Sequence, residues 1–263
     1  MTKAWILLGC GYAGRAVAAR LATAELYVTR RTLAAAEATA GEVGARAGFA
    51  VDFARPETLA ALPRGAVVVC LAPPGPDPAA EVAALAACAP SRLVYVSSTA
   101  VYGAAGGAWV DEEWPIAPVS TAGRARVAAE GALPAGAIAL RVAGIYGPGR
   151  GLAERLRAGT LRIIGDGRAH VSRIHVDDLA AAIVRAGETS VAGAVNIADD
   201  DPAPIGELAD RIAIALGLPL PPRVDPASVS ADVAAMLTAD RRIANARMKR
   251  ELGVVLRHPR VAV

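Results

Sequence analysis

The chain has 263 residues, of which 54% are hydrophobic, and its formal net charge is only +3. The basic residues are scattered, with no run or stripe of the kind that binds nucleic acid. No apolar run approaches the ~18 residues of a membrane span, and the N-terminal apolar run is interrupted at Gly9, too soon for a signal peptide. These features predict a cytoplasmic protein without nucleic-acid or membrane partners.

The expected strands and helices alternate along most of the chain. Taken in order, the expected strands are Ala4–Leu8, Leu26–Thr29, Phe49–Val51, Ala66–Leu71, Leu93–Ser97, Ile138–Val142 and Ala194–Ile197. The expected helical segments are Gly14–Thr23, Leu33–Ala45, Pro56–Leu62, Pro78–Ala87, Leu179–Ala186, Pro204–Leu216 and a piece around Arg241–Leu252. Several strands are almost wholly apolar, as in a parallel sheet covered on both faces. The pattern predicts an α/β, doubly wound, mostly parallel seven-stranded Rossmann sheet with helices on both faces.

The cysteines and histidines offer no obvious metal or disulfide chemistry. Cys10, Cys70 and Cys88 are widely spaced in apolar surroundings, and no Cys-x-x-Cys pair occurs. Neither His170 nor His258 has a carboxylate or histidine neighbour at ligand spacing. We therefore predict buried thiols and no metal site.

A glycine motif follows the first expected strand and opens a helical segment. It reads Gly9, Cys10, Gly11, Tyr12, Ala13 and Gly14. Gly9 permits a tight turn, Gly11 lets the backbone approach a pyrophosphate, and Gly14 allows close packing of helix on strand. Free N–H groups at the start of the helix, at Tyr12 and Ala13, favour the anion. In this context the motif predicts a bound nicotinamide dinucleotide.

The end of the second strand indicates which dinucleotide binds. An NAD-specific site places an acidic residue there to bind the ribose 2′-hydroxyl. This chain has Arg30 and Arg31 instead, and guanidinium groups suit bidentate contacts with a 2′-phosphate. The sequence therefore predicts NADP(H) in preference to NAD(H), with a pair of solvated surface arginines as the alternative.

The next two strands end in further cofactor candidates. Asp52 and Phe53 follow the third strand, where a side chain can touch the adenine, although Asp52 could equally cap a turn. Leu71, Ala72 and Pro73 close the fourth strand. The carboxyl ends of these strands border the expected crevice, so we predict all five residues to contact the cofactor.

The fifth strand carries a family resemblance. Val94–Gly103 reads Val-Tyr-Val-Ser-Ser-Thr-Ala-Val-Tyr-Gly and resembles the extended short-chain dehydrogenase/reductase family, in its NAD-dependent epimerase/dehydratase branch. Arg141–Gly149, Arg173–Ala180 and Val195–Asp199 resemble later motifs of that family, in family order. The resemblance implies cofactor contacts at Ser97, Val142 and Ile145, a small-molecule substrate, and a homodimer as one option.

The resemblance also implies a division of the chain. Residues 1–147 are expected to form the dinucleotide-binding Rossmann domain. Residues 148–263 are expected to form a small substrate lobe, interleaved with the sheet because Ala194–Ile197 returns to it.

The catalytic half of the family pattern is altered. The family uses a Ser or Thr, a Tyr as general acid/base, and a Lys that lowers the pKa of the tyrosine. Ser98 matches the Ser or Thr, but alignment on Glu130 puts Ala122 at the tyrosine and Arg126 at the lysine. Arg126 keeps a charge that can bind ribose or phosphate, whereas a guanidinium does not relay protons. Ser98 is therefore the main catalytic candidate, and Arg126 is a secondary one.

A replacement proton donor has several candidates. They are Tyr102, Tyr146, Asp111, Glu112 and His175. Tyr102 ranks first because its motif lies near the crevice, and the alternative is a packing role. His175 precedes an expected helix that Asp177 or Asp178 would cap, which favours a structural role for the histidine.

The sequence keeps the cofactor-binding motif of the family but lacks its catalytic Tyr–Lys pair, and two functions are compatible with this combination. The first is an NADP(H)-binding oxidoreductase or epimerase-like enzyme that acts on a small polar, sugar-derived or similar substrate. The alternative is a catalytically silent NADP(H)-binding sensor or scaffold protein.

Overall fold

The computed structural model describes residues 3–262, and its centre is a seven-stranded parallel sheet. The strands are β1 (Ala4–Leu8), β2 (Glu25–Arg30), β3 (Ala47–Ala50), β4 (Val67–Cys70), β5 (Arg92–Ser98), β7 (Ile138–Val142) and β12 (Gly193–Ile197). Their order is β12-β7-β5-β4-β1-β2-β3. The order reverses between β1 and β4, which is where doubly wound sheets bind their ligands. The predicted fold class is confirmed, and each expected strand overlaps an observed one.

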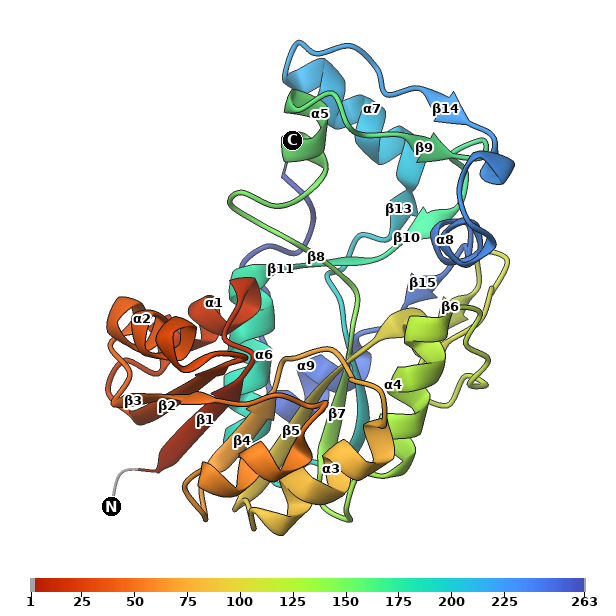
Figure 1. The fold of residues 1–263 in the computed structure, drawn as a ribbon. Coiled ribbons are helices and arrows are strands. Elements are labelled where there is room, and N and C mark those ends of the chain that lie inside the picture. The colour runs from red at the N-terminus through yellow and green to blue at the C-terminus, as the bar shows by residue number, and fades with distance from the viewer. Residues whose placement is uncertain (1–2, 263) are drawn as a thin grey trace.

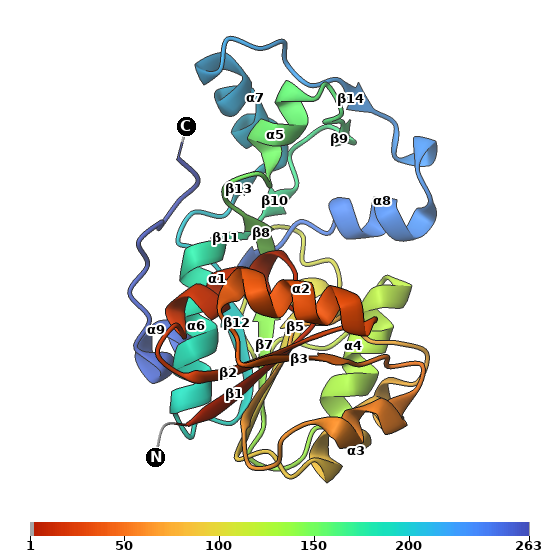
Figure 2. The same ribbon diagram turned by 60° about the vertical axis from the view of Figure 1, so that its left-hand side comes forward.

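Helices cover both faces of the sheet (Figures 1 and 2). One face carries α1 (Tyr12–Arg20), α2 (Leu33–Val43), α6 (Val176–Glu188) and α9 (Ala246–Leu252), and the other carries α3 (Pro78–Ala87) and α4 (Thr121–Gly131). Alternate residues of β1 point to opposite faces, so Leu7 joins the first apolar core and Ile6 joins the second. This explains why the strands are apolar throughout.

A second lobe stands above the C-terminal edge of the sheet (Figure 1). It contains α5 (Leu152–Arg157), α7 (Ile205–Ala215) and the short strands β9 (Ile163–Ile164), β10 (His170–Val171), β13 (Ala203–Pro204) and β14 (Arg223–Val224). The parallel pair β8 (Gly144–Tyr146) and β11 (Arg173–His175) connects the lobe to the sheet. Within residues 148–262, α6 and α9 pack on the sheet together with β12, so the lobe is smaller than the segment assigned to it.

A short helix joins the lobe to α4 across the molecule. Beyond η3 (Pro226–Ser228), α8 (Ala231–Leu237) lies between the lobe and α4 (Figure 1). The carboxylate of Asp232 accepts hydrogen bonds from the Thr121 backbone N–H at 2.9 Å and from its hydroxyl at 3.0 Å. These bonds tie α8 to the first turn of α4.

Three local predictions were wrong. Pro56–Leu62 forms a 3₁₀ helix, η1 (Pro56–Ala61), rather than an α-helix. The segment Arg241–Leu252 contains β15 (Arg242–Ile243) before α9, because it pairs with β6 (Trp109–Val110) in the long irregular loop.

The third concerns the start of α6. His175 itself caps that helix, its Nδ1 accepting the Asp177 N–H at 3.2 Å. Asp178 instead accepts the backbone N–H groups of Arg257 and His258, at 2.9 and 2.8 Å. Within residues 3–262, no helix has the length and hydropathy needed to cross a membrane.

Candidate functional site

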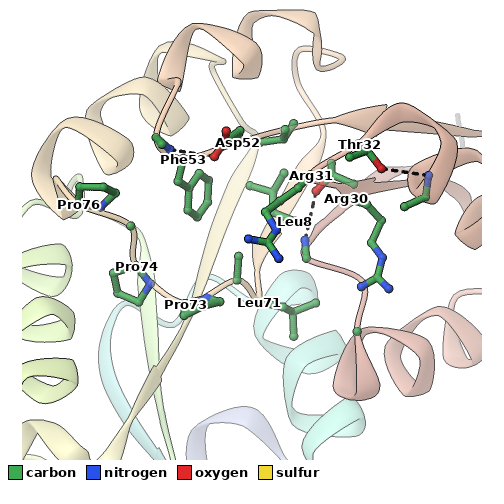
Figure 3. Close-up of a pocket in the computed structure, with 18 residues that line it drawn as sticks. Leu8, Arg30, Arg31, Thr32, Asp52, Phe53, Leu71, Pro73, Pro74 and Pro76 are labelled. Carbon is green, nitrogen blue, oxygen red and sulfur yellow. Dashed lines mark hydrogen bonds between the residues drawn. The ribbon is translucent and has the colours of Figure 1, made fainter.

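A cavity of about 820 Å³ lies at the carboxyl ends of β1, β2 and β4 (Figure 3). Nine of its lining residues are among the predicted cofactor contacts: Gly9, Gly11, Arg30, Arg31, Asp52, Phe53, Leu71, Ala72 and Pro73. The predicted contacts did not include Thr29, Thr32 and Pro76, which also line it. The cavity lies at the reversal of strand order, as expected for a nucleotide site.

The glycine turn shows why each glycine is needed. Gly9 has φ +83°, its N–H donates to Thr29 Oγ1 at 3.1 Å, and a Cβ there would lie 2.9 Å from the Ala72 nitrogen. A Cβ on Gly14 would lie 3.2 Å from Cys10 Sγ, because α1 packs tightly on the turn. A Cβ on Gly11 would meet nothing closer than 3.9 Å. Gly11 therefore leaves a space where a ligand can approach the backbone.

The start of α1 is built to receive an anion. Gly11 is its N-cap, so no side chain caps the helix. The first N–H groups of a helix have no acceptor within it, and the helix dipole places positive charge there. Tyr12, Ala13 and Gly14 form this first turn. The uncapped turn and the space beside Gly11 fit the pyrophosphate of a dinucleotide.

Two arginines project into the cavity from the end of β2 (Figure 3). Arg30 is half-buried and Arg31 is exposed. Among residues 3–262, neither guanidinium has a carboxylate partner, so both are available to an anionic ligand. The Phe53 ring and Pro73 lie on the side opposite the arginines (Figure 3).

Asp52 has a local role in its own turn. Its Oδ1 accepts the Ala54 N–H at 3.1 Å, and its Oδ2 lies 3.3 Å from Arg55 Nε. This is the turn-capping alternative considered from the sequence. Phe53, which follows it, is the one of the pair whose side chain offers an apolar face to an adenine.

A second cavity, of about 660 Å³, lies between the sheet edge and the lobe. Ser98, Val142 and Ile145 line it, which places these three predicted residues together and away from the first cavity. Ser98 Oγ accepts the Ala100 N–H at 3.1 Å, so its own proton is free to be donated. A dinucleotide whose adenosine end lay in the first cavity would have its nicotinamide end near the second.

The structure does not support Tyr102 as a proton donor. Its side chain is fully buried, and its hydroxyl donates to Asn196 Oδ1 at 2.8 Å and accepts from Arg141 Nη1 at 2.9 Å. Arg141 in turn forms a buried ion pair with Glu130 at 2.8 Å. Burial raises the pKa of Tyr102. The tyrosine belongs to a structural network beneath the cavities, which is the packing alternative.

Ser97 and Arg126 are not among the residues that line either cavity. The Ser97 hydroxyl is buried and donates to Glu130 Oε1. Arg126 Nη1 donates to the carbonyl of Val96 at 2.9 Å, so the arginine supports the end of β5. A side-chain contact from Ser97 to a cofactor is not supported. Ala122 is exposed on α4, beside the Asp232 tether, and no phenol or amine of α4 replaces the missing pair.

The fold brings His258 beside His175 and Asp177, which lie far from it in the sequence. The ligand atoms of His175, Asp177 and His258 lie within 4.8 Å of one another. The imidazole rings of His175 and His258, however, are stacked, with 3.6 Å between the ring centroids and an interplanar angle of 26°. A metal must lie near the plane of each ring it binds, so rings stacked this way do not both face one ion. The absence of a metal site stays a prediction.

The parallel sheet, with a cavity at the reversal of its strand order, defines a Rossmann protein with a candidate nucleotide site. The sequence model of the "NAD dependent epimerase/dehydratase family" matches residues 5–198. The chain therefore belongs to this family, whose cofactor class is NAD(P). The resemblance inferred from the sequence is confirmed.

Two curated relatives are reductases by name. The chain is 35% identical over 133 residues to a "3-diazoavenalumate denitrifying reductase" of a Streptomyces species, covering 46% of this chain and 43% of that one. It is 34% identical over 158 residues to the "2-alkyl-3-oxoalkanoate reductase" of Stenotrophomonas maltophilia, covering 52% and 47%. The chain thus matches less than half the length of either relative.

Solved structures match over nearly the whole chain. A functionally unknown conserved protein from Silicibacter pomeroyi has a TM-score of 0.82 and 33% identity, with 98% of this chain and 95% of that one covered. The human epimerase family protein SDR39U1, solved with NADPH, has a TM-score of 0.78 and 20% identity, with 98% and 96% covered. At that identity the human protein shows the fold alone.

Proposed function

We propose that the protein is an NADP(H)-dependent oxidoreductase that reduces a carbonyl group on a small polar substrate. The observation that carries the proposal is the pair of arginines, Arg30 and Arg31, which line the first cavity without a carboxylate partner in residues 3–262. Guanidinium groups bind a phosphate bidentately, and an NAD-specific site would need an acid here. The names of the two curated relatives support the reductase assignment.

The residues of the chain have separate roles in this reaction. The backbone of Gly11, Tyr12 and Ala13 would hold the pyrophosphate at the start of α1. When bound, the dinucleotide supplies the hydride. Ser98 would donate a hydrogen bond to the carbonyl oxygen, which stabilises the negative charge that develops there. Water would supply the proton that converts this oxygen into a hydroxyl group, because α4 carries neither the tyrosine nor the lysine of the family.

A binding titration tests the cofactor assignment directly. Purified protein titrated with NADPH and with NADH should bind NADPH at least about tenfold more tightly, because a charge-assisted hydrogen bond contributes about 1.5–3 kcal/mol. Equal affinities would refute the NADP(H) preference. Failure to bind either dinucleotide at millimolar concentration would refute the cofactor site itself.

The exposed Ala122 favours a second function, a silent NADP(H)-binding sensor or scaffold, because α4 carries no acid/base pair. A panel of carbonyl substrates with NADPH distinguishes the two. Turnover that Ser98→Ala lowers about 10²- to 10³-fold would support the enzyme. Ser91→Ala, at the exposed opposite end of β5, is the matched control. Tight NADPH binding without any turnover would support the sensor.

A further inference from the structure

We propose that the second cavity binds the carboxylate of an anionic substrate, and that Arg173 and Arg155 hold it. The inference rests on the proposed function, because it concerns the substrate of that reaction. In this proposal the two arginines determine which substrate binds and take no part in hydride transfer.

Within residues 3–262, Arg173 is a half-buried cation whose guanidinium has no hydrogen-bond acceptor. It lies on β11, opposite Gly144 of β8, and its Nη1 would lie 3.7 Å from a Cβ placed on that glycine. Its Nε is buried and has no hydrogen-bond partner within residues 3–262. Burial lowers the pKa of Arg173. A buried N–H group of a guanidinium that has no acceptor is costly. Arg173 lines the second cavity, so a ligand bound there could supply the missing acceptor.

The nearest acid does not neutralise Arg173. Asp199 and Arg173 form no ion pair within 4.0 Å, although the Asp199 N–H donates to the Arg173 carbonyl at 2.7 Å. Burial raises the pKa of Asp199 to about 7, and its Oδ2 has no hydrogen-bond partner among the described residues. A carboxyl that is partly protonated near neutral pH is a weak counter-ion.

Arg155 brings a second cation to the same cavity. It extends from α5 and forms no ion pair in the described part of the chain. It lies close enough to Arg173 that its charge lowers the pKa of the Arg173 guanidinium. Two guanidinium groups that repel each other across a cavity favour an anion between them.

The other charged groups that line the cavity are already engaged. Arg241 donates to the carbonyl of Tyr102, and the Arg150 guanidinium lies 5.4 Å from the Tyr12 ring centroid. Asp240 accepts from the backbone N–H of His170, whose ring nitrogen Nδ1 lies 2.8 Å from the same carboxylate oxygen. Among residues 3–262, Arg155 and Arg173 have neither an ion pair nor an aromatic contact, so we assign the ligand to them, with the exposed Arg150 beside them.

The charged lining of the cavity favours an anion with a planar charged group. Glu154 and Asp240 line the same space as the arginines. Four arginines, Arg150, Arg155, Arg173 and Arg241, outnumber these two acids, so the lining keeps a net positive charge that favours an anion. A carboxylate also matches the planar fork of a guanidinium.

Calorimetric titration of the NADPH-loaded protein with octanoate and with octanamide tests the proposal. The two probes differ only in the anionic group. Octanoate should bind about tenfold more tightly than octanamide, and Arg173→Gln should abolish that difference. Arg155→Gln should reduce it. Arg168→Gln, at a lobe arginine that is 91% exposed, is the matched control and should not change it.

The outcomes are separable from those of the cofactor proposal. NADPH affinity, measured first on each variant, should equal that of the wild type. If Arg173→Gln does not fold, Arg155→Gln decides the question. Equal binding of octanoate and octanamide would overturn the proposal. Binding of UDP-glucose but not octanoate, weakened by Arg155→Gln, would overturn it in favour of a diphosphate ligand.

Discussion

Alanine at Gly11 should impair cofactor binding without destabilising the fold. Gly11 has a negative φ of −90°, and an added Cβ would lie no closer than 3.9 Å to the protein. The free energy of unfolding should therefore change by less than about 0.5 kcal/mol. The same methyl group would occupy the space where the pyrophosphate meets the backbone. Loss of one charge-assisted hydrogen bond corresponds to about tenfold or more in the NADPH dissociation constant.

Two other glycines provide the comparison. Gly9→Ala would place a side chain on a left-handed backbone (φ +83°) and bring its Cβ within 2.9 Å of the Ala72 nitrogen. The two effects together should lower the free energy of unfolding by about 3 kcal/mol. Gly44→Ala adds the strain alone, about 1 kcal/mol, because nothing lies within 4 Å of its Cβ. Thermal unfolding should give reductions in Tm of about 6–12 °C for Gly9→Ala and about 2–4 °C for Gly44→Ala.

The result that would refute this reasoning is specific. If Gly11→Ala lowered Tm as much as Gly9→Ala, the space beside Gly11 would not be open. If Gly11→Ala folded normally and bound NADPH with wild-type affinity, the pyrophosphate would not lie against that turn.

Three further predictions follow. Arg30→Gln and Arg31→Gln should each weaken NADPH about tenfold and leave NADH unchanged in fluorescence titrations, whereas equal losses for both dinucleotides would contradict a 2′-phosphate contact. The pKa of Asp199 is raised from 3.8 to about 7, so the folded state binds this proton more tightly. Its contribution to the unfolding free energy should decrease by up to about 4 kcal/mol as pH rises from about 4 to about 7. Urea unfolding at several pH values across this range should show that the unfolding free energy of Asp199→Asn depends less on pH than that of the wild type. An equal pH dependence of the two proteins would contradict the raised pKa of Asp199. Asp178→Ala removes the acceptor of two backbone N–H groups of residues 257 and 258, so it should cost about 2–3 kcal/mol and speed proteolysis of that segment. Unchanged proteolysis would contradict it.

The sheet could be predicted from the sequence because its strands carry a strong local signal. Val67–Cys70 is apolar at every position, and the glycine turn fixes where the first helix begins. These features depend on neighbours in the chain. The cofactor cavity followed from them, since the carboxyl ends of parallel strands meet at one edge.

The parts that could not be predicted depend on contacts between distant residues. His258 stacks on His175 although the two residues lie far apart in the sequence. Tyr102 belongs to a sequence motif that is expected near the crevice. In the structure, however, its hydroxyl is buried and hydrogen-bonded to Arg141 and Asn196. The strands of the lobe are only two residues long, as in β9, which is too short for any periodicity to be read. The sequence did not mark Arg173 as a ligand-binding residue, because the cavity that it lines forms only when the lobe folds against the sheet.

The pairing of β8 with β11 has a mechanical consequence. A lobe joined to a sheet by one strand could twist freely about it, whereas two strands in register, from Arg173 opposite Gly144 to His175 opposite Tyr146, resist twisting. Arg173 lies on one of these strands, so its backbone keeps a nearly constant position relative to the edge of the sheet. A substrate held at its charged end would therefore be selected by the number of atoms between that end and the reacting carbon.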